Sequence, residues 1–359
     1  MPYPDIITIA CDESASEGEN LMGAKHPVFV HASVNIELDD AVAWMDGLRH
    51  AMRAQAPEIK STTALAHRNR PALLEALSEL RDRGNINLID KSYYVTAKLI
   101  DLMIAEQAHE NGFALAESGL GRQLAADLHD RGPAAIGEGK WRALLLLYNN
   151  LIRFYLRAGT TAPTSEPFFA ALDEARKIST DSRVTEILND TWDARHFASE
   201  YEGSAPSLLR DMDPMASTLK VVALAWRIRL GDVPFELLVD NYGTLDEFTR
   251  TSIINAARLP TPIGHVELPP ADLRSIRLID SKLDARVQVA DILGGVGREI
   301  ARLAAAGTFD DDLQVLVHDM LDFNGMWSND SPLDVLYERR PLLYLERFIN
   351  SRGALFPHA

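Results

Sequence analysis

Acidic residues at two widely separated points of the sequence are the side chains best placed to do chemistry. Asp12 and Glu13 directly follow an apolar run that begins at Asp5, and Asp291 lies far along the chain. A carboxylate at the end of a buried strand points toward the crevice where α/β sheets place their ligands. Carboxylate oxygens are the ligands that Mg²⁺ prefers, so these acids indicate a divalent-cation site. For Asp12 taken alone, the alternative is an ordinary turn-forming acid.

Asp291 is expected in the interior of an apolar helix over 283–306. A carboxylate among residues that favour burial is costly unless it is paired or coordinates a metal. Gly294 and Gly295 in the same helix cost about 1 kcal/mol each relative to alanine, which indicates close approach of another backbone. The alternative is that Asp291 caps or forms a salt bridge with a neighbouring helix.

Alternating strands and helices position these acids. We expect strands at 5–11, 27–36, 86–89, 235–240 and 274–280. The first two strands would form a hairpin, and strands that alternate with helices indicate parallel crossovers. The predicted fold class is therefore α/β, with a mixed and largely parallel sheet.

The chain is expected to divide into four segments. A core sheet is interrupted by a run of helical patterns and followed by a helical tail. The predicted segments are the first part of the core at 1–112, a helical insertion at 113–232, the second part of the core at 233–309 and the C-terminal tail at 310–359.

Composition limits the class of protein. The net charge of −16 argues against a general nucleic-acid coat protein, although a nuclease with a local basic groove stays compatible with it. Cys11 is the single cysteine, which excludes an internal disulfide and suits a reducing cytoplasm. The start of the chain lacks the features of a signal peptide. The most apolar run, 141–156, is short and carries charges, so we expect no membrane span.

Several blocks of the sequence resemble the family known as domain of unknown function 3800. Members of that family begin with a strand leading into D-E-S-G and end with a D-S-K…Q-x-A-D-x-x-x-G block. The resemblance covers roughly residues 5–112 and 233–306. Ala15 stands where the family has glycine, which puts the following turn in doubt but not the carboxylate. The matching residues are Asp12, Glu13 and Ser14 in the first block, Glu58 and Lys60 in an E-x-K segment, Asp240 at the end of a mid-chain strand, and Asp280, Ser281, Lys282, Gln288, Ala290, Asp291 and Gly295 in the closing block.

This resemblance implies an RNase-H-like core with a metal site. Nucleases of that kind use about four carboxylates from separate elements around two divalent ions roughly 3.5–4 Å apart. The expected catalytic and metal-binding residues are Asp12, Glu58, Asp240 and Asp291, and the expected cofactor is Mg²⁺ or Mn²⁺. Glu13 is a substitute ligand. Lys60 and Lys282 could neutralise phosphate charge, or they could simply pair with the carboxylates. Supporting or phosphate-contacting roles are expected for Glu13, Ser14, Lys60, Asp280, Lys282 and Gln288.

A basic stretch within the insertion is the candidate nucleic-acid contact. Arg153 and Arg157 lie four residues apart in an expected helix over 140–157, where they could contact a phosphate backbone. The alternative is a solvated or intersubunit face. We expect a cytoplasmic, metal-dependent nuclease acting on DNA or RNA, with the insertion open to a second copy or a protein partner. The rival interpretations are a non-catalytic interaction protein that keeps the fold and a phosphoesterase acting on a small nucleotide.

Overall fold

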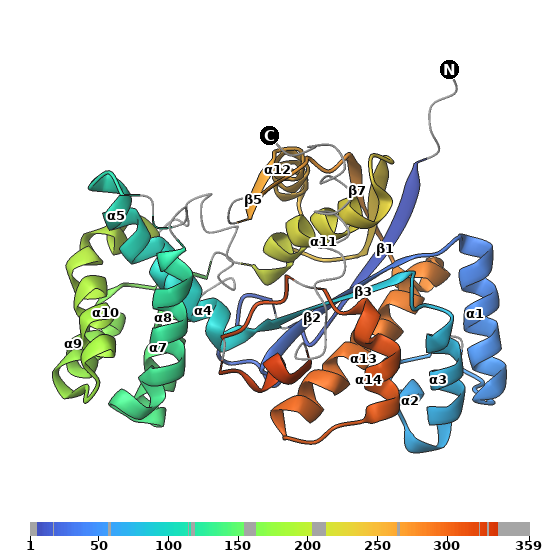
Figure 1. Ribbon diagram of the computed structural model, residues 1–359, viewed down its shortest axis with the longest axis horizontal. Coiled ribbons are helices and arrows are strands. Elements are labelled where there is room, and N and C mark those ends of the chain that lie inside the picture. The colour runs from blue at the N-terminus through green and yellow to red at the C-terminus, as the bar shows by residue number, and fades with distance from the viewer. Residues whose placement is uncertain are drawn as a thin grey trace, which may run out of the picture.

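The protein is an α/β protein built on a five-stranded sheet whose strands come from both ends of the chain (Figure 1). The computed structural model describes residues 6–16, 18–56, 59–113, 115, 119–153, 163–202, 213–263, 266–322, 324–328 and 330–336. The strands of the sheet are β1 (Ile7–Ser14), β2 (Val28–Asn35), β3 (Gly84–Asp90), β4 (Phe235–Asp240) and β7 (Leu273–Ile279). A separate ribbon pairs β5 (Thr261–Ile263) with β6 (Val266–Leu268).

The sheet has the order β3-β2-β1-β4-β7 and is mixed, as expected. β2 runs antiparallel to β1 and β3, whereas β4 runs parallel to β1 and β7. The hairpin of β1 and β2 is confirmed, but the sheet is only partly parallel, so the expectation of a largely parallel sheet is wrong. The segment between β2 and β3 contains helices, as a parallel crossover does, yet these helices return the chain in the antiparallel direction.

Alternate residues of β1 face two different hydrophobic cores, because successive side chains of a strand point to opposite faces. Ile9 and Cys11 face the core shared with the insertion, and Ala10 faces the other core. The helices around the first core include α4 (Lys91–Leu99), α11 (Pro214–Leu230) and α12 (Glu247–Ala257). Those around the second are α1 (Leu38–Ala51), α2 (Ser61–Ala64), α3 (Arg70–Ser78), α13 (Ala285–Ala305) and α14 (Asp311–Val317).

Most helices of the insertion form a lobe beside the sheet, drawn in green in Figure 1, whereas α11 packs against β2 and β3. α4 continues from the sheet into this lobe through a π-helical turn at Ile100–Ala105. The lobe contains α5 (Glu106–Glu110), α7 (Leu120–Ile136), α8 (Glu138–Leu151), α9 (Glu166–Ile178) and α10 (Ser182–Asp193). The helix expected over 140–157 therefore ends earlier, at Leu151.

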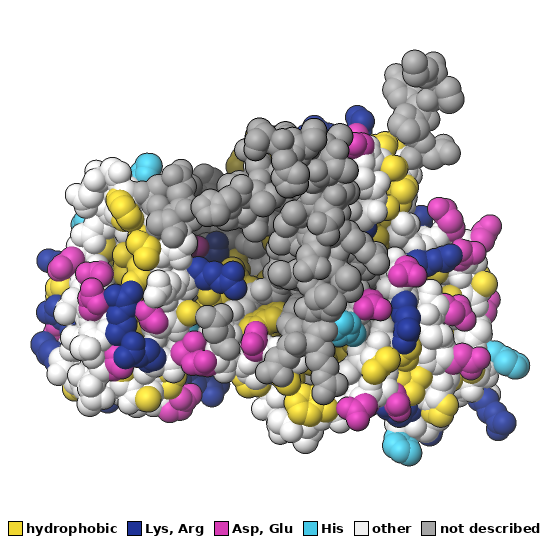
Figure 2. All heavy atoms as spheres, in the orientation of Figure 1, with side chains coloured by type: hydrophobic (Ala, Val, Ile, Leu, Met, Phe, Trp, Pro, Cys, Tyr) yellow, Lys and Arg dark blue, Asp and Glu magenta, His cyan; other side chains and the backbone are white. Residues whose placement is uncertain are grey.

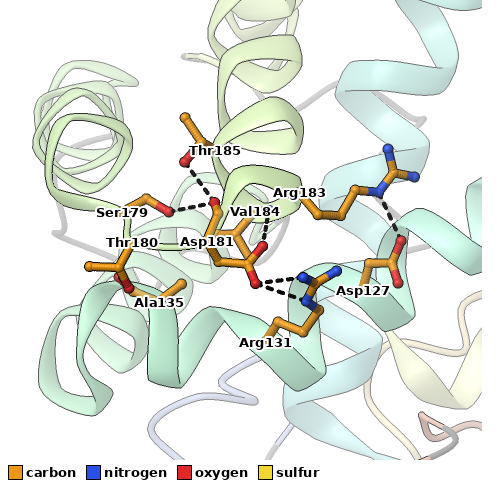
Figure 3. Close-up of polar contacts among 9 residues, drawn as sticks. All are labelled: Asp127, Arg131, Ala135, Ser179, Thr180, Asp181, Arg183, Val184 and Thr185. Carbon is orange, nitrogen blue, oxygen red and sulfur yellow. Dashed lines mark hydrogen bonds and ion pairs between the residues drawn. The ribbon is translucent and has the colours of Figure 1, made fainter.

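Charged side chains join α7 to the start of α10 in this lobe (Figure 3). Asp181 caps α10 by accepting a hydrogen bond from the Val184 amide at 3.0 Å, and it also pairs with Arg131 of α7 at 2.6 Å. Arg183 of α10 pairs with Asp127 of α7 at 2.9 Å. The arginine belongs to α7 in one ion pair and to α10 in the other, and the two pairs together hold the helices in position.

Three glycines let α13 pack closely on its neighbours. A Cβ at Gly294 would lie 3.5 Å from the Ser14 Cβ on β1, and a Cβ at Gly297 would lie 2.8 Å from the Val30 side chain on β2. Gly295 instead faces α2, where an added Cβ would be only 2.1 Å from the Cβ of Ser61. The expected close approach to the strand is therefore made at Gly294, and Gly295 serves a different contact.

The segment after α14 returns to the sheet. Leu321 and Met326 form isolated bridges with Ile86 and Ile89 of β3, beyond the edge of the named strands. Short 3-10 turns lie at His318–Met320 and Pro332–Leu336. Among the described residues, no helix is both long and apolar enough to span a membrane.

Candidate functional site

The ends of β1 and β4 bring two acids next to each other. The parallel register pairs Ala10 with Leu238 and Cys11 with Val239, so the next step along both strands places Asp12 beside Asp240. Neighbouring strands are about 4.8 Å apart, and residues at matching positions share a face. Asp12 lies two residues beyond Ala10, and its side chain is 7% exposed. Both acids therefore lie on the face of the sheet that α13 covers.

Asp12 lies inside β1, where the sequence predicted a strand that stopped before it. Pairing with β2 continues through Asp12, Glu13 and Ser14, whereas pairing with β4 stops at Cys11. The last three residues of β1 are thus held on one side only. This one-sided extension fixes the backbone of Asp12 while leaving its side chain at the edge where β4 ends.

α13 brings Asp291 to the same place. Gly294 packs on Ser14, and Asp291 lies one helical turn before Gly294, hence on the same side of the helix. The charge of Asp291 reaches the Asp12 carboxyl and raises its pKa. Asp12 and Asp291 are 279 positions apart in the sequence, and packing of α13 on β1 is what puts them within electrostatic range.

The environment of Asp12 disfavours its charged form. Burial raises the pKa of the Asp12 carboxyl far above its usual range, and the charges of Glu13, Asp291 and Asp240 act in the same direction. The Glu13 amide donates a hydrogen bond to Asp12 Oδ1 at 2.8 Å and offsets part of this effect. A carboxylate surrounded by other acids is stabilised by a bound cation.

Glu13 points to the opposite face of the sheet from Asp12. Burial raises the pKa of the Glu13 carboxyl, a hydrogen bond with the Glu13 backbone opposes the rise, and the charge of Asp240 adds to it. Its Oε2 atom is buried and has no hydrogen-bond partner. An unsatisfied buried carboxylate oxygen is costly, and a cation or a proton would relieve the cost.

Asp240 is held by backbone amides at the end of β4. Its Oδ1 atom accepts hydrogen bonds from the Asn241 amide at 2.8 Å and from the Ser281 amide at 2.9 Å. The second bond comes from the residue that follows β7 by two positions. The carboxylate is therefore oriented by two separate segments of chain, while its other oxygen takes part in neither of these two bonds.

Asp213 is a buried acid of this region that sequence reasoning missed. It is 1% exposed and caps α11 by accepting a hydrogen bond from the Met215 amide at 2.9 Å. The Tyr242 hydroxyl donates to it at 3.2 Å, and the Thr244 hydroxyl also donates. Burial raises the pKa of Asp213, and its charge raises that of Glu13. The Asp-Pro pair at 213–214 signals a helix start, but nothing in that pair indicates proximity to β1.

Residues of the closing block make mainly local contacts. Asp280 is exposed and accepts a hydrogen bond from the amide of Lys282, whose own side chain is exposed. Gln288 Nε2 donates to the Ser281 carbonyl at 3.0 Å. Because Ser281 also donates to Asp240, Gln288 supports the turn that orients this acid.

The first block and the E-x-K segment meet at α13. Ser14 is buried under Gly294, and Ser61, which follows the exposed Lys60, lies under Gly295. Glu58 is outside the described residues. The described end of its segment therefore lies against the same helix that carries Asp291, one turn further along.

Of the two residues of the proposed nucleic-acid contact, the one that the structure describes, Arg153, does not lie in a helix. Arg153 lies two residues beyond the end of α8, and Arg157 is outside the described residues. The expectation that both arginines share one face of a single helix is wrong for Arg153. The physical reason is that the backbone leaves the helical conformation at Ile152, where φ is −91° and ψ is 4°, so α8 ends after Leu151.

Within the part of the chain that the structure describes, no group of three or more His, Cys, Asp or Glu side chains is arranged to hold a metal ion. Asp12, Asp240 and Asp291 interact electrostatically but do not form a ready-made coordination site. The geometry supplies carboxylate oxygens from two strands and one helix, which is the donor chemistry that Mg²⁺ and Mn²⁺ favour.

Fold and site together define the class: an α/β protein with a mixed sheet and buried or half-buried acids gathered where β1 and β4 end. The chain matches no family model, no curated protein and no solved structure in sequence and structure comparisons.

Proposed function

We propose that the protein is a metal-dependent nuclease that hydrolyses phosphodiester bonds at the ends of β1 and β4. The observation that carries the proposal is the convergence of Asp12, Asp240 and Asp291 on one face of the sheet. Burial and neighbouring acids raise the pKa of Asp12 in the metal-free protein. Clusters of acids with strongly perturbed pKa values at strand ends are typical of functional sites.

An RNase-H-like core is the finer fold assignment that we propose. The order β3-β2-β1-β4-β7, with an antiparallel half and a parallel half, is consistent with it. A helix packed on the central strand carries the last acid of the series, Asp291, as the family resemblance implies. The left-handed Ala15 after the D-E-S block is also the position where that family has glycine.

The residues present are of the chemical type that binds a divalent cation. Asp12, Asp240 and Asp291 would supply the carboxylate oxygens. Because no three of the described acids are already arranged around one point, binding would require these side chains to move toward one another. Glu58 stays in the proposal as a ligand suggested by the sequence alone.

Each residue then has a distinct task. Asp12, on the central strand, would be the central ligand. The Asn241 and Ser281 amides would keep Asp240 in orientation. Asp291 would close the site from α13. Divalent ions bound to such a cluster lower the pKa of an attacking water and stabilise the leaving oxygen.

The charged surface bears on the choice of substrate. On the face drawn in Figure 2, acidic and basic side chains of the described residues are interspersed. The net charge of −16 favours a substrate that is held near the metal site over one that is bound along a long basic groove.

The test is metal binding and cleavage measured on the same variants. Calorimetric titration with Mn²⁺, and cleavage of labelled single- and double-stranded DNA and RNA, should both be lost in Asp12→Asn and Asp291→Asn. Asp82→Asn, which changes an exposed acid before β3, is the matched control and should behave as the wild type. Wild-type protein that neither binds Mn²⁺ nor cleaves any of the four substrates would exclude the nuclease.

A non-catalytic interaction protein is the second candidate. The observation that favours it is that the described acids are not prearranged around a metal. It predicts that Asp12→Asn leaves partner binding by the helical lobe unchanged, whereas the nuclease proposal predicts loss of activity with the fold intact.

A further inference from the structure

The turn after β1 contains a residue in a disfavoured conformation. Ala15 has a φ of +62°, in the left-handed region that residues with a Cβ seldom adopt. It directly follows Ser14, the last residue of the strand that carries Asp12 and Glu13. A non-glycine residue stays in that region only when the surrounding structure holds it there.

Lys91 holds this turn from the β3 side. Its side chain is 2% exposed, and its Nζ atom donates a hydrogen bond to the Ala15 carbonyl at 2.8 Å. The Lys91 amide is itself fixed by the Pro27 carbonyl at 2.9 Å. β1 and β3 both run antiparallel to β2, so their C-terminal ends lie at the same edge of the sheet. A buried lysine thus bridges the ends of two strands that are not neighbours.

Tyr242 holds the turn from the β4 side. Its hydroxyl lies 3.0 Å from Ser16 Oγ and donates to Asp213 Oδ1 at 3.2 Å. Asp213 is fixed in turn as the cap of α11. The residue after Ala15 is therefore connected to the loop after β4 and to the start of α11.

We propose that Lys91 and Tyr242 are positioning residues that clamp the turn at Ala15 and Ser16, and so fix the end of β1 that presents Asp12 and Glu13. The contacts of the clamp do not depend on the proposed function. Only its purpose, which is to hold a carboxylate site in place, rests on that proposal. In this proposal neither residue acts as a metal ligand: Lys91 bonds the Ala15 carbonyl and Tyr242 bonds the Ser16 hydroxyl, so both act on the turn and through it on the acids.

The first experiment reads the clamp without any metal. Amide hydrogen exchange at residues 13–16 should become at least about tenfold faster in Lys91→Met, because removing the tether makes local opening of the turn easier. Tyr242→Phe should accelerate the same amides, and Lys98→Met, a lysine further along α4, is the matched control that should not. Unchanged exchange in Lys91→Met would overturn the proposal.

The second experiment tests whether Lys91 acts through the left-handed turn. Glycine adopts that conformation without strain, so losing the tether relieves strain only when residue 15 is alanine, and Lys91→Met should destabilise the protein more in an Ala15→Gly background than in the wild type. A double-mutant cycle in urea should show coupling of at least about threefold in the unfolding equilibrium constant between the two substitutions. Fully additive effects would mean that Lys91 stabilises the protein by some other contact, and the clamp would be wrong.

Metal affinity links the clamp to the site. Lys91→Met should weaken Mn²⁺ binding by about tenfold or more, as expected for residues that orient metal ligands. If the turn opens in Lys91→Met but the variant binds Mn²⁺ as tightly as the wild type, the positioning role is wrong. If wild-type protein binds no Mn²⁺, the proposed function fails, and the exchange and urea experiments still decide whether the clamp exists.

Discussion

Glu13 and His31 lie directly opposite each other as partners on β1 and β2, and both face the core shared with the insertion. His31 is fully buried, and neither of its ring nitrogens has a hydrogen-bond partner. Asn87 continues the row on β3, with its Oδ1 atom also unpartnered. Burial lowers the pKa of His31 to about 3. The imidazole is therefore uncharged in the folded protein at neutral pH, next to an acid and an amide.

His31 should make the protein sensitive to acid. Its pKa is lower in the folded state than the value of about 6.5 expected in the unfolded state. The unfolded chain therefore takes up a proton first, and stability is lost as pH falls from about 6.5 toward 3. His31→Leu should remove this loss, which amounts to roughly 2–3 kcal/mol between pH 7 and pH 4.5. Urea unfolding of both proteins at the two pH values measures it, and an equal loss in both would show that other groups cause the acid sensitivity.

Asp12→Asn should stabilise the metal-free protein. The pKa of the Asp12 carboxyl is higher in the folded than in the unfolded state, so its stability contribution is full below about pH 4 and is lost as pH rises above that. At about pH 8 the variant should be more stable by about 1 kcal/mol or more, since an amide carries no charge to bury. Thermal melts with and without millimolar Mn²⁺ provide the check. Metal should raise the melting temperature of the wild type by mass action and leave that of the variant unchanged.

Gly295→Ala should destabilise the protein and Gly294→Ala should stabilise it, although the two residues are adjacent. A Cβ at position 295 would lie 2.1 Å from the Ser61 Cβ, which forces α13 and α2 apart. Overpacking of this kind costs about 1–3 kcal/mol. A Cβ at position 294 meets ordinary contacts of 3.5 Å or more, and alanine favours the helix by up to about 1 kcal/mol. Urea midpoints compare the two, and Ser61→Gly should rescue Gly295→Ala. A destabilised Gly294→Ala with a neutral Gly295→Ala would contradict the packing of α13.

Ala15→Gly should stabilise the protein by about 1 kcal/mol. The left-handed conformation at φ +62° costs a residue with a Cβ roughly 1–2 kcal/mol, which glycine avoids. The greater freedom of glycine in the unfolded chain offsets part of this stabilisation. The opposite exchange, Gly47→Ala in the middle of α1 with open space around it, is the control and should also stabilise, but through helix propensity. Urea midpoints measure both changes. A destabilised Ala15→Gly would show that the turn adopts another conformation in solution.

The five strands of the main sheet were predictable because their apolar, β-branched runs are local, whereas the short strands β5 and β6 were not expected from the sequence. The expected strand at 235–240 coincides with β4, and the expected strand at 274–280 is shifted by one residue from β7. α13 begins and ends within two residues of its expected bounds. The end of β1 was not predictable in the same way, because Asp12 to Ser14 are polar and become strand only by pairing with β2.

The sequence by itself determined the approximate positions of the five strands of the main sheet and of α13, since periodicity, caps and apolar runs act over a few residues. Only the tertiary structure decided that β2 and β3 pair antiparallel despite the helices between them, and that Asp213 reaches the region of Glu13. It also decided that Lys91, a residue without any motif, holds the turn at Ala15. The physical reason is that pairing, burial and charge interactions depend on segments far apart in the chain, whose contacts exist only once the sheet and α13 have packed together.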